Sequence, residues 1–353
     1  MRIRVIGAGV AGLTTALEFA RAGCDVELIE RNEKPGTGCS TVAGGLLGPW
    51  CEKVENPHPL LQDLGLESIA YWIDIVPVAQ RRGTLVVTAP RDKPELHRFG
   101  RQTSGFETCD AAKLTELEPD LSGRFEQALY FRDEAHLEPR AAVAALAAQL
   151  ATLPRVTLCF CMDATHARGT VDWTIDCRGL DGRDALPALR GVRGEMLVLA
   201  TREIALRRPI RFLHPRHPIY IVPRMNGRFM IGATSIETES EGKITARSAV
   251  ELLNAAYAVH PAFGEAEIVQ TGVGHRPAFP DNLPKIRVAD RMIFLNGLYR
   301  HGFLLAPALA RRVVKVALDK AYFPEVMDEY PGERQGARNR LDDARRPAPR
   351  AGL

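Results

Sequence analysis

The sequence predicts an α/β protein in which a domain of βαβ type is interleaved with a second, α+β domain built on an antiparallel sheet. Residues 2–6 form a short apolar run that leads into a glycine-rich turn and then a helical pattern. Between residues 194 and 233, four short strand patterns follow one another with little helix between them, which indicates an antiparallel sheet. A chain of 353 residues also exceeds what one hydrophobic core usually serves, so two domains are expected.

The first turn has the composition that a dinucleotide pyrophosphate requires. Backbone N–H groups must come close to the phosphates, so side chains have to be absent, and the positive end of the following helix opposes the phosphate charge. A second strand pattern ends in an acid about twenty residues later, where a ribose hydroxyl needs an acceptor. We therefore predict a Rossmann-like domain whose cofactor-binding residues include Gly7, Ala8, Gly9, Val10, Ala11, Gly12 and Glu30. The acid argues against a 2′-phosphate but leaves both FAD and NAD open.

A second glycine-rich passage follows the acid. Its small residues predict that the backbone passes against a flat ring system, although a plain cluster of turns has the same composition. Strand 173–177 runs into a further glycine turn that we expect to approach phosphate or ribose. The cofactor-binding residues predicted from these two stretches are Arg31, Ser40, Thr41, Ala43, Gly44, Gly45, Leu46, Cys177 and Gly179.

The remaining elements follow from periodicity and from helix-breaking residues. Helices are predicted at residues 60–79, 140–153, 248–259 and 303–320. Strands are predicted at residues 83–89, 128–131, 156–160, 194–200, 210–213, 219–222, 228–233, 268–277 and 292–297. These elements suggest a discontinuous cofactor domain of residues 1–80, 135–190 and 265–325, and a substrate domain of residues 81–134 and 191–264, with residues 331–353 as a disordered tail.

Composition argues against several classes of function. The formal net charge is only +3, and no basic face with interleaved aromatic residues accompanies it, so no nucleic-acid partner is expected. The sequence shows no run of about eighteen apolar residues and no leader before residue 2, which predicts a cytoplasmic protein without a membrane segment. The seven cysteines lack paired zinc spacing, so reduced thiols and no metal site are expected. A homo-oligomer stays open.

Five segments in order resemble the D-amino-acid oxidase superfamily of flavoproteins, and most of all the glycine oxidases of thiamine biosynthesis. The segments are residues 7–13 with Glu30, 40–49, 220–234, 274–284 and 299–307. The resemblance implies an FAD domain with an antiparallel substrate domain. It also implies oxidation of a small amino acid to an imine, with O2 reduced to H2O2, and use of the glycine imine for the thiazole ring of thiamine. In the related sarcosine oxidases a cysteine of the later motif region is linked to the flavin, and this sequence has no cysteine after Cys177, so the resemblance implies FAD bound non-covalently.

The resemblance also implies which residues hold the substrate. Arg276 is predicted to bind the α-carboxylate, since a guanidinium grips two oxygens in a planar fork; the alternative is a structural arginine paired with Asp281. Tyr220 is predicted to face the substrate, or else to be a half-buried strand aromatic. Arg300 is predicted near flavin and substrate, or else as a cap for carbonyls. The helix that begins there is predicted to aim its positive end at the flavin pyrimidine, so Arg300, His301, Gly302, Phe303 and Leu304 join the cofactor-binding set.

No catalytic residue is assigned, because hydride transfer from a neutral amine to the flavin needs no protein base. His275 and His301 lie in the right motifs for a base, but such histidines more often satisfy backbone hydrogen bonds. Three other functions stay open at this point. They are a small D-amino-acid or sarcosine dehydrogenase that passes electrons to an acceptor other than O2, a non-catalytic flavin-binding protein, and an NAD-dependent dehydrogenase.

Overall fold

The first three elements form where the sequence places them. In the computed structural model, which describes residues 1–327, strand β1 (Arg2–Ile6) leads into helix α1 (Val10–Arg21), and strand β2 (Asp25–Ile29) follows. The apolar positions of β1 and the inner face of α1 are buried because they share one hydrophobic core. β1 and β2 pair in parallel over five residues each, so Glu30 lies at the same sheet edge as the glycine turn.

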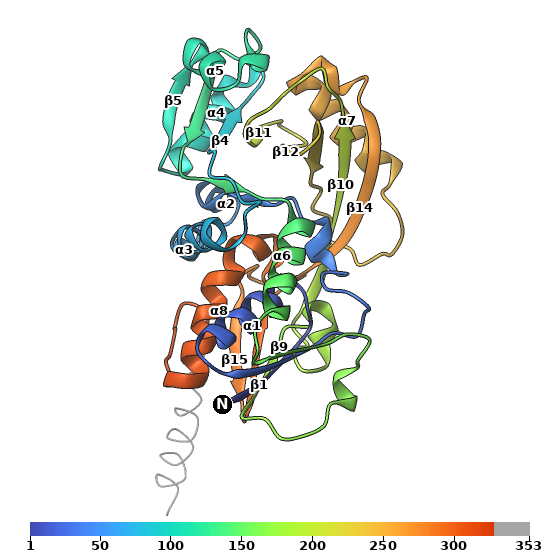
Figure 1. The fold of residues 1–353 in the computed structure, drawn as a ribbon. Coiled ribbons are helices and arrows are strands. Elements are labelled where there is room, and N and C mark those ends of the chain that lie inside the picture. The colour runs from blue at the N-terminus through green and yellow to red at the C-terminus, as the bar shows by residue number, and fades with distance from the viewer. Residues whose placement is uncertain (328–353) are drawn as a thin grey trace, which may run out of the picture.

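This pair lies in a six-stranded sheet at the N-terminal end of the elongated molecule (Figure 1). The strand order is β15-β16-β9-β1-β2-β8, and all neighbours pair in parallel except β15 with β16. The added strands are β8 (Val156–Cys159), β9 (Trp173–Asp176), β15 (Lys285–Ala289) and β16 (Met292–Asn296). The carboxyl ends of the parallel strands meet at one edge, where α/β sheets bind their ligands.

Helix α8 (Gly302–Asp319) packs on α1 and begins at this same edge. Pro307 lies inside the helix and has no N–H to give to the carbonyl of Phe303, four residues earlier. The indole N–H of Trp72 donates to that carbonyl instead, at 2.7 Å. Trp72 belongs to α3 (Pro59–Ile75), so α3 contacts α8 and satisfies the hydrogen bond that proline removes.

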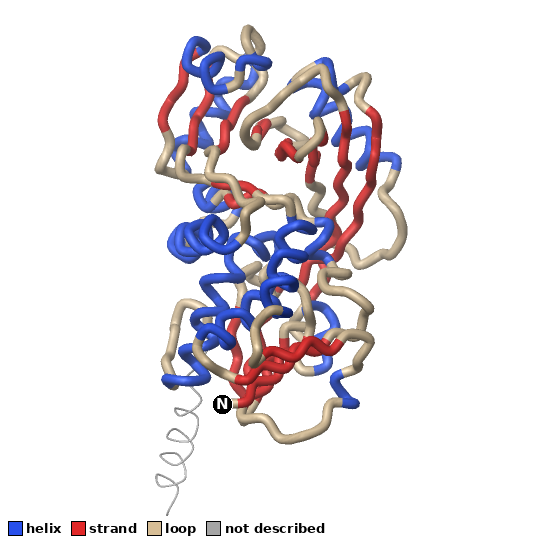
Figure 2. Tube along the Cα trace, in the orientation of Figure 1, coloured by secondary structure: helices blue, strands red, loops and turns tan. Residues whose placement is uncertain are grey.

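The second sheet has eight strands in the order β14-β10-β13-β12-β11-β4-β6-β5, and it fills the other half of the molecule (Figure 2). Its pairs are antiparallel as predicted, except that β11 and β4 run in parallel. Its strands are β4 (Thr84–Val87), β5 (Glu107–Asp110), β6 (Gln127–Phe131), β10 (Arg190–Ala200), β11 (Ile210–Phe212), β12 (Ile219–Arg224), β13 (Arg228–Gly232) and β14 (Glu267–Ala278).

Strand β14 lies in the second sheet, although the domain boundary suggested by the sequence would assign it to the first. The return to the first sheet was expected at residue 265, but β14 pairs with β10 along its length and forms one edge of the second sheet. The alternation of polar and apolar residues gives no sign of this, because a long edge strand and a crossing segment share that pattern. The chain therefore reaches the first sheet only after Ala278, with β15.

The other helices cover the sheets or join them. α7 (Ala246–Val259) packs on β10, β12 and β13, and α6 (Pro139–Ala151) packs on α1. α2 (Pro49–Glu55) was not predicted; it packs on α3 between the two sheets. The remaining elements are α4 (Lys93–Gln102), α5 (Ala111–Leu117), β3 (Leu46–Leu47) and β7 (Ala135–His136). None of the helices within residues 1–327 combines the length and apolar character needed to cross a bilayer.

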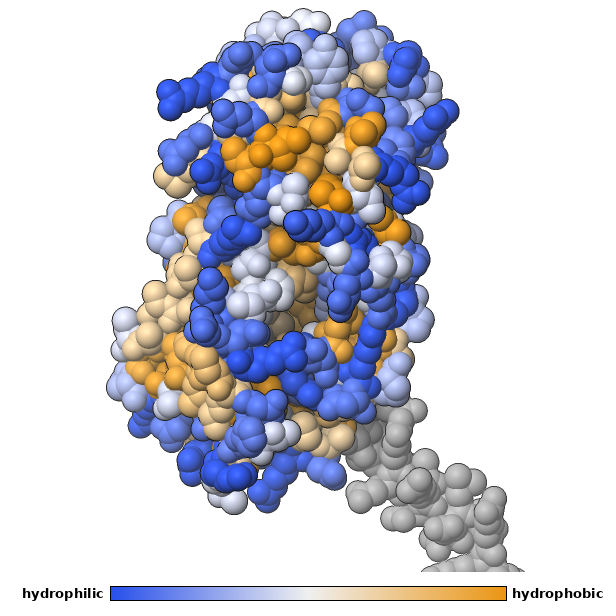
Figure 3. Space-filling view, turned by 90° about the vertical axis from the view of Figure 1, so that its right-hand side faces the viewer, coloured by the Kyte–Doolittle hydropathy of each residue, from blue (hydrophilic) through white to orange (hydrophobic). Residues whose placement is uncertain are grey.

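Polar side chains cover much of the face that Figure 3 presents, and hydrophobic ones gather in its upper half. Among the exposed large apolar residues, Val250 and Tyr257 lie on α7 and Ile268 and Val269 on β14. The predicted disordered tail, residues 331–353, lies outside the described residues.

Candidate active site at the junction of the two sheets

A cavity of about 720 Å³ begins at the carboxyl ends of β1 and β2 and ends beneath β10, β12 and β14 of the second sheet. This volume is in the range of ligand sites, which is roughly 300–1,000 Å³. All predicted site residues line it except Ala8 and Gly12, which are buried behind the first turn. The cavity therefore joins segments from both ends of the described chain.

The first turn fits a dinucleotide because its glycines have no room for side chains. Gly7 has φ +97°, and a β-carbon there would lie 2.9 Å from the carbonyl oxygen of Cys177. A β-carbon on Gly12 would lie 1.8 Å from the oxygen of Gly7, so α1 can approach β1 only because this residue is glycine. Gly12 thus shapes the turn, while Gly9 faces the cavity.

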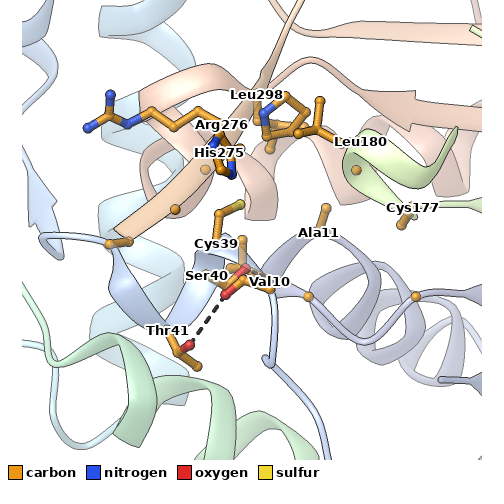
Figure 4. Close-up of a pocket in the computed structure, with 18 of the residues that line it drawn as sticks. Val10, Ala11, Cys39, Ser40, Thr41, Cys177, Leu180, His275, Arg276 and Leu298 are labelled. Atoms are coloured by element: carbon orange, nitrogen blue, oxygen red, sulfur yellow. Dashed lines mark hydrogen bonds between the residues drawn. The ribbon is translucent and has the colours of Figure 1, made fainter. Parts of the chain in front are cut away.

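Ser40 completes the phosphate end of the cavity. Its hydroxyl oxygen accepts a hydrogen bond of 3.1 Å from the N–H of Val10, in the first turn of α1. The hydroxyl proton stays available to a phosphate oxygen, and the helix N-terminus supplies positive potential beside it. Figure 4 shows Ser40 and Val10 facing each other, with Ala11 beside them and Thr41 farther along the same segment.

Glu30 lies where the sequence predicts it, but its carboxylate has partners within the protein. One oxygen accepts from the N–H of Ala8 at 2.8 Å, and the other accepts from the backbone and side-chain amides of Asn32 at 3.0 and 2.6 Å. The oxygen that faces Ala8 accepts only this one hydrogen bond from the described residues and keeps a second lone pair, so a ribose hydroxyl can still donate to it. Farther out at the same end, Arg31 pairs with Asp181 at 2.6 Å.

The opposite end of the cavity fits a flat ring system. A β-carbon on Gly44 would lie 2.5 Å from the ring of Tyr220, and one on Gly45 would lie 2.1 Å from the carbonyl oxygen of Leu137. Arg224 donates to the carbonyl of Gly44 at 2.9 Å and so fixes this backbone. Gly302 and the next two residues line the cavity with the first turn of α8, whose free N–H groups can oppose negative charge.

Arg276 has the contacts that a binder of a substrate carboxylate needs. Its Nη2 donates to the carbonyl of Thr234 at 3.0 Å, while its Nη1 is buried and has no hydrogen-bond partner among the described residues. Asp281, the alternative partner, instead accepts from the N–H of Leu283 and lies near Lys285. Burial lowers the pKa of Arg276, yet a guanidinium stays charged in proteins. An unpaired buried cation of this kind favours an anionic ligand.

Arg300 also lines the cavity, but the structure gives it partners that the sequence reading missed. Its Nε donates to Glu52 at 2.9 Å, and its Nη1 pairs with Glu55. Arg211, from β11, pairs with both glutamates as well. Among the described residues, Arg300 therefore does not cap carbonyls, which was the alternative prediction; it is held by two carboxylates of α2.

The two glutamates were missed because the glycine-rich passage was taken to end at Pro49 and the residues between it and the helix predicted from residue 60 were assigned to no element. One signal was available: Pro49 after Gly48 suits the first position of a helix, and Glu52 and Glu55 then lie three apart on one face. Burial opposes ionisation of Glu52, but Arg300, His301 and Arg211 outweigh it and hold the pKa of Glu52 well below its usual range.

The two histidines of the motifs are engaged in hydrogen bonds. His301 is buried, and its Nε2 lies 3.2 Å from a carboxylate oxygen of Glu52. His275 has its Nε2 3.0 Å from the carbonyl of Ser240. Figure 4 shows His275 and Arg276 on the same strand, on the side of the cavity opposite Ser40. Cys39 lies between this strand and Ser40.

Comparisons with known proteins agree with this geometry. The family model described as FAD dependent oxidoreductase matches residues 2–316. The chain is 54% identical over 329 residues to the putative thiamine biosynthesis oxidoreductase ThiO of Rhizobium etli, covering 92% of this chain and 99% of that protein. It is 26% identical to the glycine oxidase of Bacillus licheniformis over 95% of this chain and 98% of that one.

A similar fold is present in the crystal structure of glycine oxidase from Geobacillus kaustophilus. That structure aligns with a TM-score of 0.78 at 21% identity, covering 91% of this chain and 96% of its own. The family match decides between the two dinucleotides that the first motif left open, in favour of FAD, and it confirms the resemblance to flavoproteins. The chain belongs to the family of FAD-dependent oxidoreductases.

Proposed function

We propose that this protein oxidises glycine or another small amino acid to the imine, with FAD as its non-covalently bound cofactor and O2 reduced to H2O2. The observation that carries the proposal is Arg276, a guanidinium in the cavity with a buried, unpartnered Nη1. A cation held out of water without a carboxylate partner is costly unless an anion joins it. The α-carboxylate of an amino acid supplies that anion at the end of the cavity away from Glu30.

The names of the relatives support the same reaction and suggest its purpose. Glycine oxidases from two bacilli resemble the chain over nine-tenths of its length or more, in sequence or in fold. The ThiO protein of Rhizobium etli, which shares more than half of its aligned residues, is named for thiamine biosynthesis. We therefore propose that the imine made from glycine is used to build the thiazole ring of thiamine.

The residues of this chain bind and orient the substrate. Arg276 holds the carboxylate, and Tyr220, whose ring lies against Gly44, closes the pocket beside it. When bound, FAD supplies the acceptor for the two electrons and the hydrogen that leave the α-carbon. No base is assigned, because a substrate bound with a neutral amine already has the lone pair that forms the imine, and positioning carries most of the catalysis.

The test is a spectrum of the purified holoenzyme mixed with glycine, sarcosine or D-alanine without oxygen. Bleaching of the flavin band by glycine, followed by formation of H2O2 when air is admitted, is the expected result. Bleaching without H2O2 would favour the dehydrogenase, and a flavin that stays oxidised with all three would favour the non-catalytic alternative. A cytoplasmic location and a homo-oligomer remain predictions from the sequence.

A further inference from the structure

Two guanidinium groups line the substrate end of the cavity, and their surroundings differ. Arg276 donates a hydrogen bond to the carbonyl of Thr234, and its Nη1 has no hydrogen-bond partner within the described residues. Arg300 has Nε 2.9 Å and Nη2 3.4 Å from the carboxylate of Glu52, and Nη1 paired with Glu55. All three nitrogens of Arg300 therefore face carboxylates of the protein, whereas Arg276 faces none.

Arg300 and its partners form a set of paired charges, which we call the Glu52 cluster: Glu52, Glu55, Arg211 and Arg300. His301 lies next to it, with its Nε2 3.2 Å from a carboxylate oxygen of Glu52. Arg211 is almost completely buried and pairs with both glutamates. The pKa values of both glutamates lie below the usual range, because the two arginines, joined by His301 in the case of Glu52, outweigh the effect of burial. The cluster thus holds two positive and two negative charges and is neutral overall.

The backbone fixes this arrangement. Glu52 and Glu55 are one helical turn apart on α2, so both carboxylates point to one side of the helix. Arg211 comes from the middle of β11, and Arg300 comes from the turn that precedes α8. A helix, a strand of the second sheet and the turn before α8 therefore meet in the cluster. Arg300 cannot turn to a ligand without leaving carboxylates that are themselves partly or wholly removed from water.

We propose that Glu52 and Glu55 determine substrate specificity by withholding Arg300 from the substrate, so that the site takes amino acids with a single carboxylate and rejects those with two. This inference rests on the proposed function, since it concerns the same site. A first carboxylate binds to Arg276. A second one would have to lose its water beside the carboxylate of Glu52, which lines the cavity, and within residues 1–327 no further unpaired arginine at this end would compensate.

The test compares glycine with iminodiacetate, which is glycine carrying a second carboxymethyl group on its nitrogen. Glu55→Gln keeps the shape of the side chain and one acceptor oxygen but removes one negative charge, which leaves Arg300 partly unneutralised. We expect the ratio of kcat/KM for iminodiacetate to kcat/KM for glycine to rise about tenfold or more, as one charge-assisted hydrogen bond would give. Glu55→Asp keeps the charge and should keep the wild-type ratio.

Glu67→Gln is the matched control, because it removes the same charge from the molecule at a place outside the cavity. Glu67 lies on α3 and pairs with Arg311 and Arg312. If the cluster only stabilises the fold, Glu55→Gln lowers both rates together and leaves the ratio unchanged, which overturns the proposal. Glu52→Gln serves as the second variant if Glu55→Gln does not fold.

A binding measurement separates this inference from the proposed function. Malonate and acetate do not react, and their dissociation constants can be measured by calorimetry on the holoenzyme. The wild type is expected to bind malonate no more tightly than acetate, and Glu55→Gln to bind malonate about tenfold more tightly than the wild type does. If Glu55→Gln binds malonate more tightly than the wild type does, but the wild type oxidises no glycine, only the proposed function is contradicted. If the two proteins bind malonate equally well, the inference is contradicted.

Discussion

The guanidinium of Arg276 is the single group whose removal should affect substrate binding most. Arg276→Ala takes away the charged partner of the carboxylate, and a hydrogen bond to a charged group contributes about 1.5–3 kcal/mol, or roughly a 10- to 100-fold change in affinity. We expect the KM for glycine to rise by that factor while the protein keeps its FAD, because Arg276 lies at the other end of the cavity from the glycine turn at residues 7–12, where the phosphates are expected. Steady-state kinetics with the flavin absorbance recorded beforehand would measure both.

An Arg276→Ala variant with an unchanged KM would remove this residue from the substrate site. The alternative ion pair with Asp281 makes a different prediction. Asp281→Asn should leave KM as it is, because the carboxylate of Asp281 accepts from the N–H of Leu283 and lies near Lys285 rather than near Arg276.

The sequence indicates features of single residues that local geometry decides, but it does not indicate partners that come from far along the chain. The need for glycine at residues 7 and 12 could be predicted because it arises mostly within the turn: a β-carbon on Gly12 would meet the oxygen of Gly7, and one on Gly7 would meet the carbonyl oxygen of Cys177. The partners of Arg300 could not, since Glu52 is 248 positions away and only the folded chain brings the two together. The same holds for Arg211 and Glu55.

At the scale of elements, the first turn of α2 depends on a buried carboxylate. Glu134 follows β6, and one of its oxygens accepts from the N–H groups of Trp50 and Cys51 at 3.2 and 3.0 Å. Burial raises the pKa of Glu134 to about 7, although hydrogen bonds from Thr84 and Cys51 act in the opposite direction. Because α2 carries Glu52 and Glu55, this carboxyl group positions the helix on which the Glu52 cluster stands.

The raised pKa of Glu134 predicts how stability depends on pH. Between the unfolded value of 4.5 and the folded value of about 7, the native state binds more protons than the unfolded state, so stability falls as pH rises through this interval. Glu134→Gln keeps an acceptor for the two N–H groups and cannot ionise. The wild type should therefore lose roughly 2–3 kcal/mol of unfolding free energy between pH 5 and pH 8 that Glu134→Gln does not lose.

Urea unfolding at the two pH values measures this difference directly. Glu126→Gln is a suitable control, because Glu126 is exposed and pairs only with the exposed Lys93 in the described structure. A difference between Glu134→Gln and the wild type that does not change with pH would show that Glu134 is ionised throughout.

The pair of Trp72 and Pro307 gives a second prediction at this scale. Trp72→Phe leaves the carbonyl of Phe303 without the indole donor, which should cost about 1–3 kcal/mol. Pro307→Ala supplies a backbone N–H for that same carbonyl. The proline substitution should therefore stabilise the Trp72→Phe variant more than it stabilises the wild type, as a double-mutant cycle of thermal or urea unfolding would show. Additive effects would mean that the two groups do not share the carbonyl.

Most elements could be predicted from the sequence because their periodicity and their capping residues agree. Pro139 begins α6 and Pro49 begins α2, yet only the first was predicted, since α2 is seven residues long and offers too short an apolar pattern. The position of strand β14 along the chain was predicted correctly, but the strand was assigned to the wrong sheet, because a strand pattern does not indicate which strand it pairs with. The parallel pair of β11 and β4 was missed for the same reason.

At the scale of the whole molecule, bound FAD should contact both sheets and thereby stabilise the folded protein. The cavity takes its lining from β1 and β2 of one sheet and from β10, β12 and β14 of the other. A ligand that binds only the folded state stabilises it by about 2.7 kcal/mol at a concentration of 100 times its Kd. We expect the Tm of the apoprotein to rise steadily with the logarithm of FAD concentration.

Differential scanning fluorimetry with FAD and, as the control, NAD measures this effect. NAD has the same adenosine and pyrophosphate but carries the smaller nicotinamide ring in place of isoalloxazine, so its shift should be smaller at equal concentration. Equal shifts for the two dinucleotides would mean that the segment at residues 299–304 contributes little to binding.

The architecture of the cavity also sets an order of events during synthesis. Gly7, at the phosphate end, and Leu304, in the first turn of α8, line the same cavity although almost the whole described chain separates them. A ribosome that adds about 5–20 residues per second needs roughly 15–60 seconds to pass from one to the other. The nascent chain thus presents its phosphate turn early but can enclose the isoalloxazine ring only near the end of translation, so insertion of the flavin is a late step in the biogenesis of this enzyme.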